Sequence, residues 1–134
     1  MDGWALLTAA CEHFKVDEEE AWRRLHFLCP QAIVPAADIV DSAKLTKVVA
    51  KTSRRSFFLV KGSKKNTHHL TIPGLCTCSA YKHTVCTNPQ GAIICKHALA
   101  GMLGDATARF ELLELSDDAW VSQFCKAWQS DFGD

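Results

Sequence analysis

The stretch that decides the fold is residues 76–100, CTCSAYKHTVCTNPQGAIICKHALA, which holds four of the seven cysteines of this 134-residue chain and two of its six histidines. Its reactive side chains form two pairs, C-x-C at Cys76 and Cys78 and C-x-H at Cys95 and His97, with sixteen residues between the pairs. In an extended segment, residues two apart point to the same face, so the first pair can offer both sulfurs to one ion. We interpret the four side chains as a metal site.

The second pair requires a particular backbone. On a regular helix, residues two apart diverge by about 200°, so Cys95 and His97 cannot both be ligands from the middle of a helix. They must straddle a helix start, and GAII before them and ALAGML after them allow this. A thiolate is electrostatically favoured at such an N-terminus.

Three thiolates and one imidazole form a closed tetrahedral set, which is typical of structural zinc. Closing the loop between the pairs costs roughly 2.5 kcal/mol, whereas structural zinc contributes about 10–16 kcal/mol of apparent binding. We therefore expect one structural Zn²⁺ on which at least residues 70–104 depend for folding. Three alternatives stay open: His83 or Cys86 replaces one of the ligands, the cysteines are simply buried, or Cys76 and Cys78 form a redox pair.

The motif resembles the SWIM-type zinc finger, in which C-x-C is followed by an aromatic residue, here Tyr81, and then by C-x-H-x-x-A, here CKHALA. The surrounding ADIVDSAKLTKV and RRSFFLVKG extend the likeness over about Leu25 to Ala100. This stretch of sequence is similar to the small SWIM subunit of Shu complexes, the zinc finger SWIM domain-containing protein seven family. The resemblance implies the zinc ligands Cys76, Cys78, Cys95 and His97, with Ala100 packing behind them.

For function, the resemblance implies a non-catalytic, nuclear accessory subunit of homologous recombination and DNA repair. Such a subunit forms a heterodimer with a RecA-type recombinase paralogue and promotes recombinase filament assembly on single-stranded DNA. SWIM motifs also occur in transposase-related proteins, so a transposase-derived DNA-binding module is one alternative. A zinc-dependent protein–protein adaptor without direct DNA contact is the other.

Charge is distributed unevenly although the net charge is zero. Residues 42–104 hold ten Lys or Arg and no Asp or Glu, and both flanks are acidic. Such asymmetry is typical of an anion-facing centre. The candidate nucleic-acid contacts are Lys47, Lys51, Arg54, Arg55, Lys61, Lys64 and Lys65, and the aromatic candidates for base stacking are Phe57, Phe58 and Tyr81. The alternative is that the cations solvate a sheet and the aromatics fill the core; Phe57 and Phe58 point to opposite faces.

A second candidate surface is apolar. Trp120, Phe124 and Trp128 recur every four residues near the C-terminus. Such a stripe is most often core, but an exposed part could anchor the recombinase paralogue. The N-terminal helices, with Trp4 and Trp22, offer another partner surface.

The sequence gives little support for an enzyme. His97 is followed by Ala98 and Leu99, not by the H-x-E of zinc deaminases, and no acid lies between Asp41 and Asp105. No phosphate-binding glycine loop is present. We expect no catalytic residues and no small-molecule substrate.

The predicted fold is a single α+β domain over residues 1–134, with a helical part at 1–43, a basic β-hairpin region and zinc finger at 44–104, and a helical part at 105–134. MDGWALL lacks the basic region of a secretory signal and no run is apolar enough for a membrane span, so we expect a soluble chain with reduced thiols. The expected helices are 4–14, a helix that follows the cap Asp17 and stops at Pro30, 36–43 with Pro35 at its start, 97–103 ending near Gly104, and 117–129 capped by Ser116. Glu20 can complete a capping box with Asp17. The expected strands, all antiparallel, are 45–51, 56–61 and 67–72. We interpret His68 and His69 as ordinary residues of the last strand, and we expect the cysteines on apolar stripes, Cys11, Cys29 and Cys125, to lie in the core.

Overall fold

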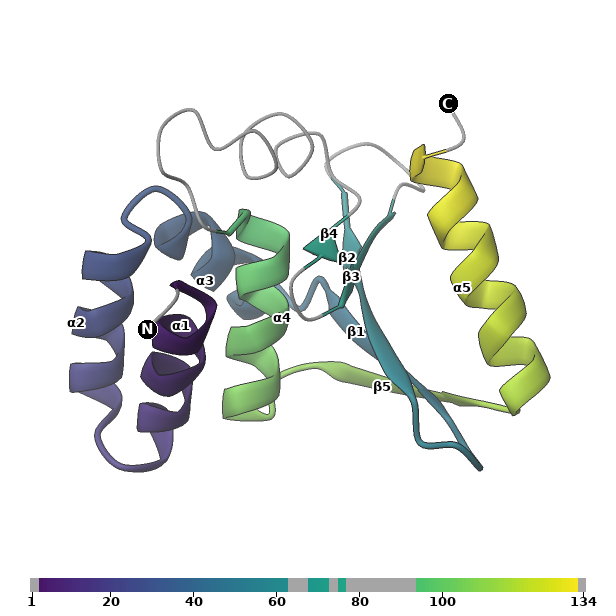
Figure 1. Cartoon of the computed structure of the whole chain (residues 1–134), viewed down its shortest axis with the longest axis horizontal. Coiled ribbons are helices and arrows are strands. Elements are labelled where there is room, and N and C mark those ends of the chain that lie inside the picture. The colour runs from purple at the N-terminus through teal and green to yellow at the C-terminus, as the bar shows by residue number, and fades with distance from the viewer. Residues whose placement is uncertain (1–2, 63–67, 73–74, 77–93, 133–134) are drawn as a thin grey trace.

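The computed structural model describes residues 3–62, 68–72, 75–76 and 94–132 of the chain. They form three layers: four helices on one face of a β-sheet, the sheet, and one long helix on the other face (Figure 1). The predicted α+β class is therefore confirmed. In this part of the chain, no helix is both long and apolar enough to cross a membrane.

Three helices precede the sheet. They are α1 (Gly3–Glu12), followed by the 3-10 turn η1 (His13–Lys15), α2 (Glu18–Leu28) and α3 (Ile33–Asp41). The α2 helix ends directly before the C-cap Cys29 and Pro30, as predicted. The α3 helix begins three residues earlier than expected, because a proline is tolerated within the first turn, where its missing N–H has no intrahelical acceptor.

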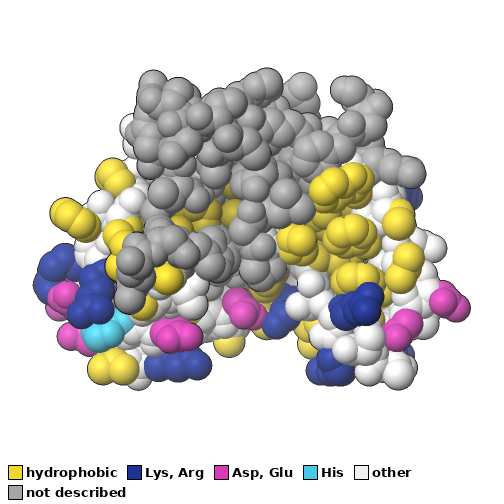
Figure 2. Space-filling view, in the orientation of Figure 1, with side chains coloured by type: hydrophobic (Ala, Val, Ile, Leu, Met, Phe, Trp, Pro, Cys, Tyr) yellow, Lys and Arg dark blue, Asp and Glu magenta, His cyan; other side chains and the backbone are white. Residues whose placement is uncertain are grey.

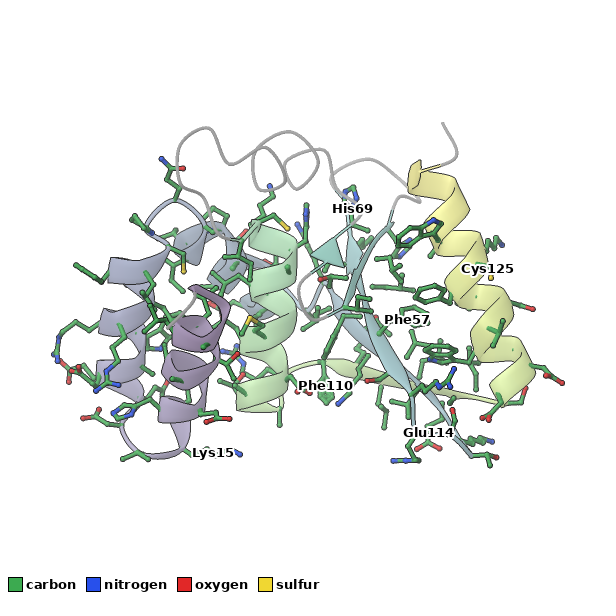
Figure 3. The ribbon with its side chains drawn as sticks, viewed as in Figure 1. Lys15, Phe57, His69, Phe110, Glu114 and Cys125 are labelled. Carbon is green, nitrogen blue, oxygen red and sulfur yellow. The ribbon has the colours of Figure 1, made fainter. Side chains whose placement is uncertain are left out.

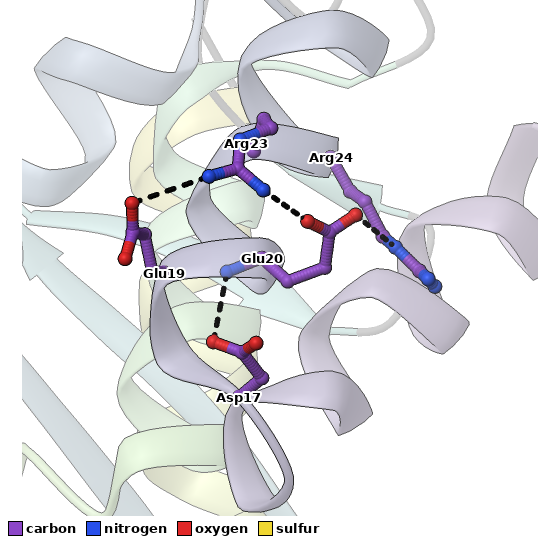
Figure 4. Close-up of polar contacts among 5 residues, drawn as sticks. All are labelled: Asp17, Glu19, Glu20, Arg23 and Arg24. Atoms are coloured by element: carbon purple, nitrogen blue, oxygen red, sulfur yellow. Dashed lines mark hydrogen bonds and ion pairs between the residues drawn. The ribbon is translucent and has the colours of Figure 1, made fainter.

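The start of α2 has the predicted cap. Asp17 accepts a hydrogen bond from the backbone N–H of Glu20 at 3.2 Å, and three acidic residues occupy the first turn. Glu20 also binds Arg23 and Arg24, while Arg23 reaches Glu19 (Figure 4). The hydrogen bond from Arg24 is the main cause that lowers the pKa of Glu20 below its ordinary value.

The sheet contains β1 (Leu45–Ala50), β2 (Ser56–Lys61), β3 (His68–Ile72), β4 (Leu75–Cys76) and β5 (Glu111–Leu115) in the order β4-β3-β2-β1-β5. The first three strands lie at the predicted positions and pair antiparallel. The expectation of a wholly antiparallel sheet is wrong, because β5 runs parallel to β1. It also places a strand inside the part predicted as helical, 105–134.

Side chains alternate between two cores. Leu45 and Val60 face the layer of α1–α3 and α4 (Lys96–Thr107), whereas Val48, Phe57 and Leu70 face the long helix α5 (Asp117–Phe132). Phe57 and Phe58 point to opposite faces, as predicted: Phe57 packs in the α5 core and Phe58 against the other. The sheet is thus covered on both sides, and Cys95 and His97 belong to the helical layer that covers the first face.

The helix α4 (Lys96–Thr107) continues past Gly104, so the prediction that this glycine ends the helix is wrong. The helix ends instead before Ala108, which adopts a left-handed conformation with φ 56°. Glycine is needed at position 104 for space, because an added Cβ would lie 2.2 Å from Leu45 Cδ2 and 3.1 Å from the Arg109 carbonyl oxygen. This residue lets α4 approach β1 closely.

Gly104→Ala is therefore expected to destabilise the protein by about 1–3 kcal/mol through overpacking, although alanine is the better helix former. The matched control is Gly101→Ala in the same helix, where the added Cβ would meet Thr71 Cγ2 at an ordinary 3.4 Å. That variant should keep its stability or gain up to about 1 kcal/mol. Urea unfolding of both variants measures the difference, and equal midpoints would contradict the close approach.

Candidate metal centre

The second half of the motif lies across the start of α4, as predicted. Cys95 is the N-cap residue, with extended backbone at φ −88° and ψ 163°, and its Sγ accepts a hydrogen bond from the Ala98 N–H at 3.4 Å. His97 is the second residue of the helix. The change of backbone from extended to helical brings both side chains to one helix end, where the helix dipole favours a thiolate.

His97 lies in an unusual setting for a histidine. It is only 8% exposed, and its Nδ1 is buried with no hydrogen-bond partner among the residues that the structure describes. A buried polar atom in such a state needs a water molecule or an ion as its partner. A ring nitrogen that binds a metal meets this description, so the residue fits the role that the motif predicts. Ala100, one turn further on, is fully buried in the core behind it.

The first half of the motif is described only in part. The backbone of Cys76 forms the end of β4 and pairs opposite Thr71 of β3, a strand that contacts α4. Cys78 lies outside the described residues, as do His83 and Cys86, the alternative ligands. Within the described part of the chain, no three His, Cys, Asp or Glu side chains gather around one point. The complete four-ligand set therefore stays a prediction.

A histidine that sequence reasoning took for an ordinary strand residue lies beside this helix start. The ring of His69 in β3 (Figure 3) is 4.5 Å from the ring of His97, centroid to centroid, with an angle of 36° between the planes. His69 is opposite Val60 and two residues before Thr71, on the face that α4 covers. The strand alternation could have indicated this face, but not the contact with His97.

The predicted basic residues do not form one group. Lys47 binds Asp105 of α4 at 2.9 Å and lies over the rings of Phe58 and Phe110. Lys51, Arg54 and Arg55 are exposed in the turn between β1 and β2, whereas Lys61 is exposed at the opposite end of β2. Lys64 and Lys65 lie outside the described residues, as does Tyr81. Two separate ends of the β1–β2 hairpin thus carry the exposed cations.

The aromatic stripe of α5 faces the sheet. Trp120 and Phe124 pack on Phe57, with centroids 5.3 and 5.5 Å away, and Trp128 stacks on Phe124. The Trp120 Nε1–H donates to the Val48 carbonyl at 3.0 Å. Figure 2 shows hydrophobic side chains gathered between the sheet and α5. The contacts observed for the stripe are those of a core; its use as a partner surface stays a prediction.

The remaining described cysteines differ in environment. Cys11 and Cys29 are buried, as predicted. Burial raises the pKa of the Cys11 thiol to about 12, with a smaller contribution from the charge of Cys29, and burial raises the pKa of Cys29 to about 11. Both thiols stay protonated and inert at neutral pH. The prediction that Cys125 is core is wrong, because it is exposed on the outer side of α5 (Figure 3).

Known proteins with similar sequences carry the name that the motif indicated. The zinc finger SWIM domain-containing protein 7 homolog of Dictyostelium discoideum is 26% identical over 106 residues, which are 78% of this chain and 67% of that protein. The Homo sapiens zinc finger SWIM domain-containing protein 7 is 27% identical over 111 residues, 83% of this chain and 79% of that protein. The Danio rerio protein of this name is 29% identical over 93 residues, 69% of this chain and 66% of that protein.

No protein-family model and no solved structure matches the chain. The similarity to these proteins confirms the resemblance to the SWIM zinc finger family that residues 76–100 predicted. The relatives are named as zinc finger proteins and not as enzymes.

Proposed function

We propose that this chain is a non-catalytic accessory subunit of a Shu-like complex, which pairs with a RecA-type recombinase paralogue and promotes recombinase filament assembly on single-stranded DNA. The observation that carries the proposal is the start of α4, where Cys95 caps the helix and His97 holds a buried Nδ1 that lacks a partner among the described residues. This arrangement occurs in a chain similar to SWIM zinc finger proteins.

Cys95 and His97 would hold one structural Zn²⁺ together with Cys76 and Cys78. A zinc ion with four protein ligands ties together segments distant in sequence and leaves no position for a substrate. The chain's own residues then supply the recognition surface. The β3–β4 end of the sheet and α4 would be held in one arrangement, and loss of the metal would alter every surface that depends on it.

Direct contact with DNA is the finer part of the proposal. Lys51, Arg54 and Arg55 are exposed at one tip of the β1–β2 hairpin, where they are free to approach phosphates. Lys47 is instead engaged by Asp105. Because this ion pair occupies Lys47, the chain would contact few phosphates, or would be an adaptor that contacts only protein. A long basic groove is less favoured.

The test is affinity purification of the tagged full-length chain from its native cell. We expect a RecA-like ATPase to copurify with the wild type and to be lost with Cys95→Ala and with His97→Ala. Both variants remove a predicted zinc ligand at the start of α4. Cys125→Ala is the matched control, because this cysteine is exposed on the far side of the sheet, and it should keep the ATPase.

The double variant Arg54→Glu, Arg55→Glu separates pairing with the ATPase from binding of single-stranded DNA. It should keep the ATPase and weaken binding of single-stranded DNA, with a shallower dependence of affinity on salt. Unchanged DNA binding would exclude Arg54 and Arg55 as the contact, whereas a wild type that binds no DNA would leave the adaptor alternative. A wild type that brings down no ATPase would contradict the proposed pairing.

A further inference from the structure

The contact between His69 and His97 joins β3 to the first turn of α4. Their ring centroids are 4.5 Å apart and the planes are tilted by 36°, and this distance is at the close end of the range for packed aromatic rings. His97 is buried, and Nδ1 of His69 is likewise screened from solvent. Two imidazoles packed at this depth restrict each other's rotation.

The register of the sheet explains why His69 reaches this position. His69 and Thr71 are two residues apart in β3, opposite Val60 and Phe58 of β2. Val60 and Phe58 pack in the core that α4 shares, and Thr71 Cγ2 would meet a Cβ placed on Gly101 of α4. His69 therefore emerges on the α4 face, whereas its neighbour His68 is exposed.

A histidine that binds a metal needs something to hold its ring plane. In most metal sites, a hydrogen bond to the second ring nitrogen performs this task. Nδ1 of His97 is the buried nitrogen that fits the ion, so the ring needs a further contact to fix its plane. Packing against another ring restricts the plane in the same way, and His69 supplies that ring.

We propose that His69 is a positioning residue of the metal centre: its ring packs on the imidazole of His97 and holds it in the orientation that binds the ion. This inference rests on the zinc site of the proposed function. In this proposal, the shape of the His69 ring matters and its nitrogen atoms do not bind the ion. A flat ring that cannot bind metal should therefore be able to take the place of His69 without loss of metal binding. A direct ligand could not be replaced in this way.

The experiment compares full-length His69→Phe, His69→Ala and the control His68→Ala, each loaded with Co²⁺ as a spectroscopic probe. Metal affinity is measured by competition with a chelator, and the visible absorption of Co²⁺ reports the ligand set. We expect His69→Ala to bind the metal about 10-fold more weakly, at the lower end of the usual cost of losing a residue that orients a ligand. His69→Phe should bind like the wild type with the same spectrum, and His68→Ala should change neither.

Other results would overturn the proposal. If His69→Phe is as weak as His69→Ala and its Co²⁺ spectrum changes, His69 is a ligand. If His69→Ala binds like His68→Ala, His69 has no role at the site. If His69→Ala does not fold, His69→Gln takes its place, because it keeps polar groups and loses the ring. A wild type that binds no Co²⁺ would instead contradict the metal centre itself. This result differs from those that contradict only the role of His69.

Discussion

Removal of zinc with a chelator is expected to unfold at least residues 70–104, with loss of α4 helicity and of the cooperative melting transition. Structural zinc contributes about 10–16 kcal/mol of apparent binding at neutral pH, which is as large as the roughly 5–15 kcal/mol that holds a whole domain together. The α4 helix contributes Leu99, Ala100 and Leu103 to the core that it shares with α1–α3. Its loss should therefore spread to the N-terminal helices.

Far-ultraviolet circular dichroism and thermal melting before and after chelation measure this effect. Added Zn²⁺ should restore both signals, and Mg²⁺ should not, because Mg²⁺ prefers oxygen ligands to thiolates. A chelated sample with unchanged circular dichroism and an unchanged melting temperature would refute the dependence on zinc.

Phe57→Ala is expected to destabilise the protein by about 3–5 kcal/mol, the usual cost of truncating a buried phenylalanine. The side chain is 1% exposed and lies at the centre of the α5 core, in contact with Trp120 and Phe124 (Figure 3). Because α5 packs on the sheet through these aromatic contacts, the variant should loosen the helix from the sheet and expose its aromatic stripe. Chemical unfolding followed by tryptophan fluorescence measures both effects.

Phe27→Ala is the matched control, since this phenylalanine of α2 is 86% exposed. It should change the free energy of unfolding by no more than about 0.5 kcal/mol. Phe57→Leu should lie between the two, because it retains most of the buried volume. If Phe57→Ala were as mild as Phe27→Ala, α5 would not depend on the sheet for its position, and its stripe would be a stronger candidate for a partner surface.

Local patterns were read correctly where short-range chemistry decides the backbone. The Asp17 cap and the Ser116 cap, whose Oγ accepts from the Ala119 N–H at 3.2 Å, are present as predicted. The start of α4 between Cys95 and His97 is also confirmed, because a two-residue spacing of predicted ligands allows few backbone paths. Capping groups and ligand spacings act over a few residues, so they can be recognised in one dimension.

The amino-acid order alone was sufficient for the α+β class, the first three strands and the likeness to SWIM zinc finger proteins, because strand alternation and motif spacing are local properties. Long-range packing decided the rest. The segment ELLEL at 111–115 is rich in helix formers and became a strand only by pairing with β1. Gly104 is needed inside α4 because Leu45 fills the space beside it, and His69 joins the candidate metal centre because sheet register carries it to His97. Each of these outcomes depends on a neighbour far away in the chain, and no local pattern encodes such a contact.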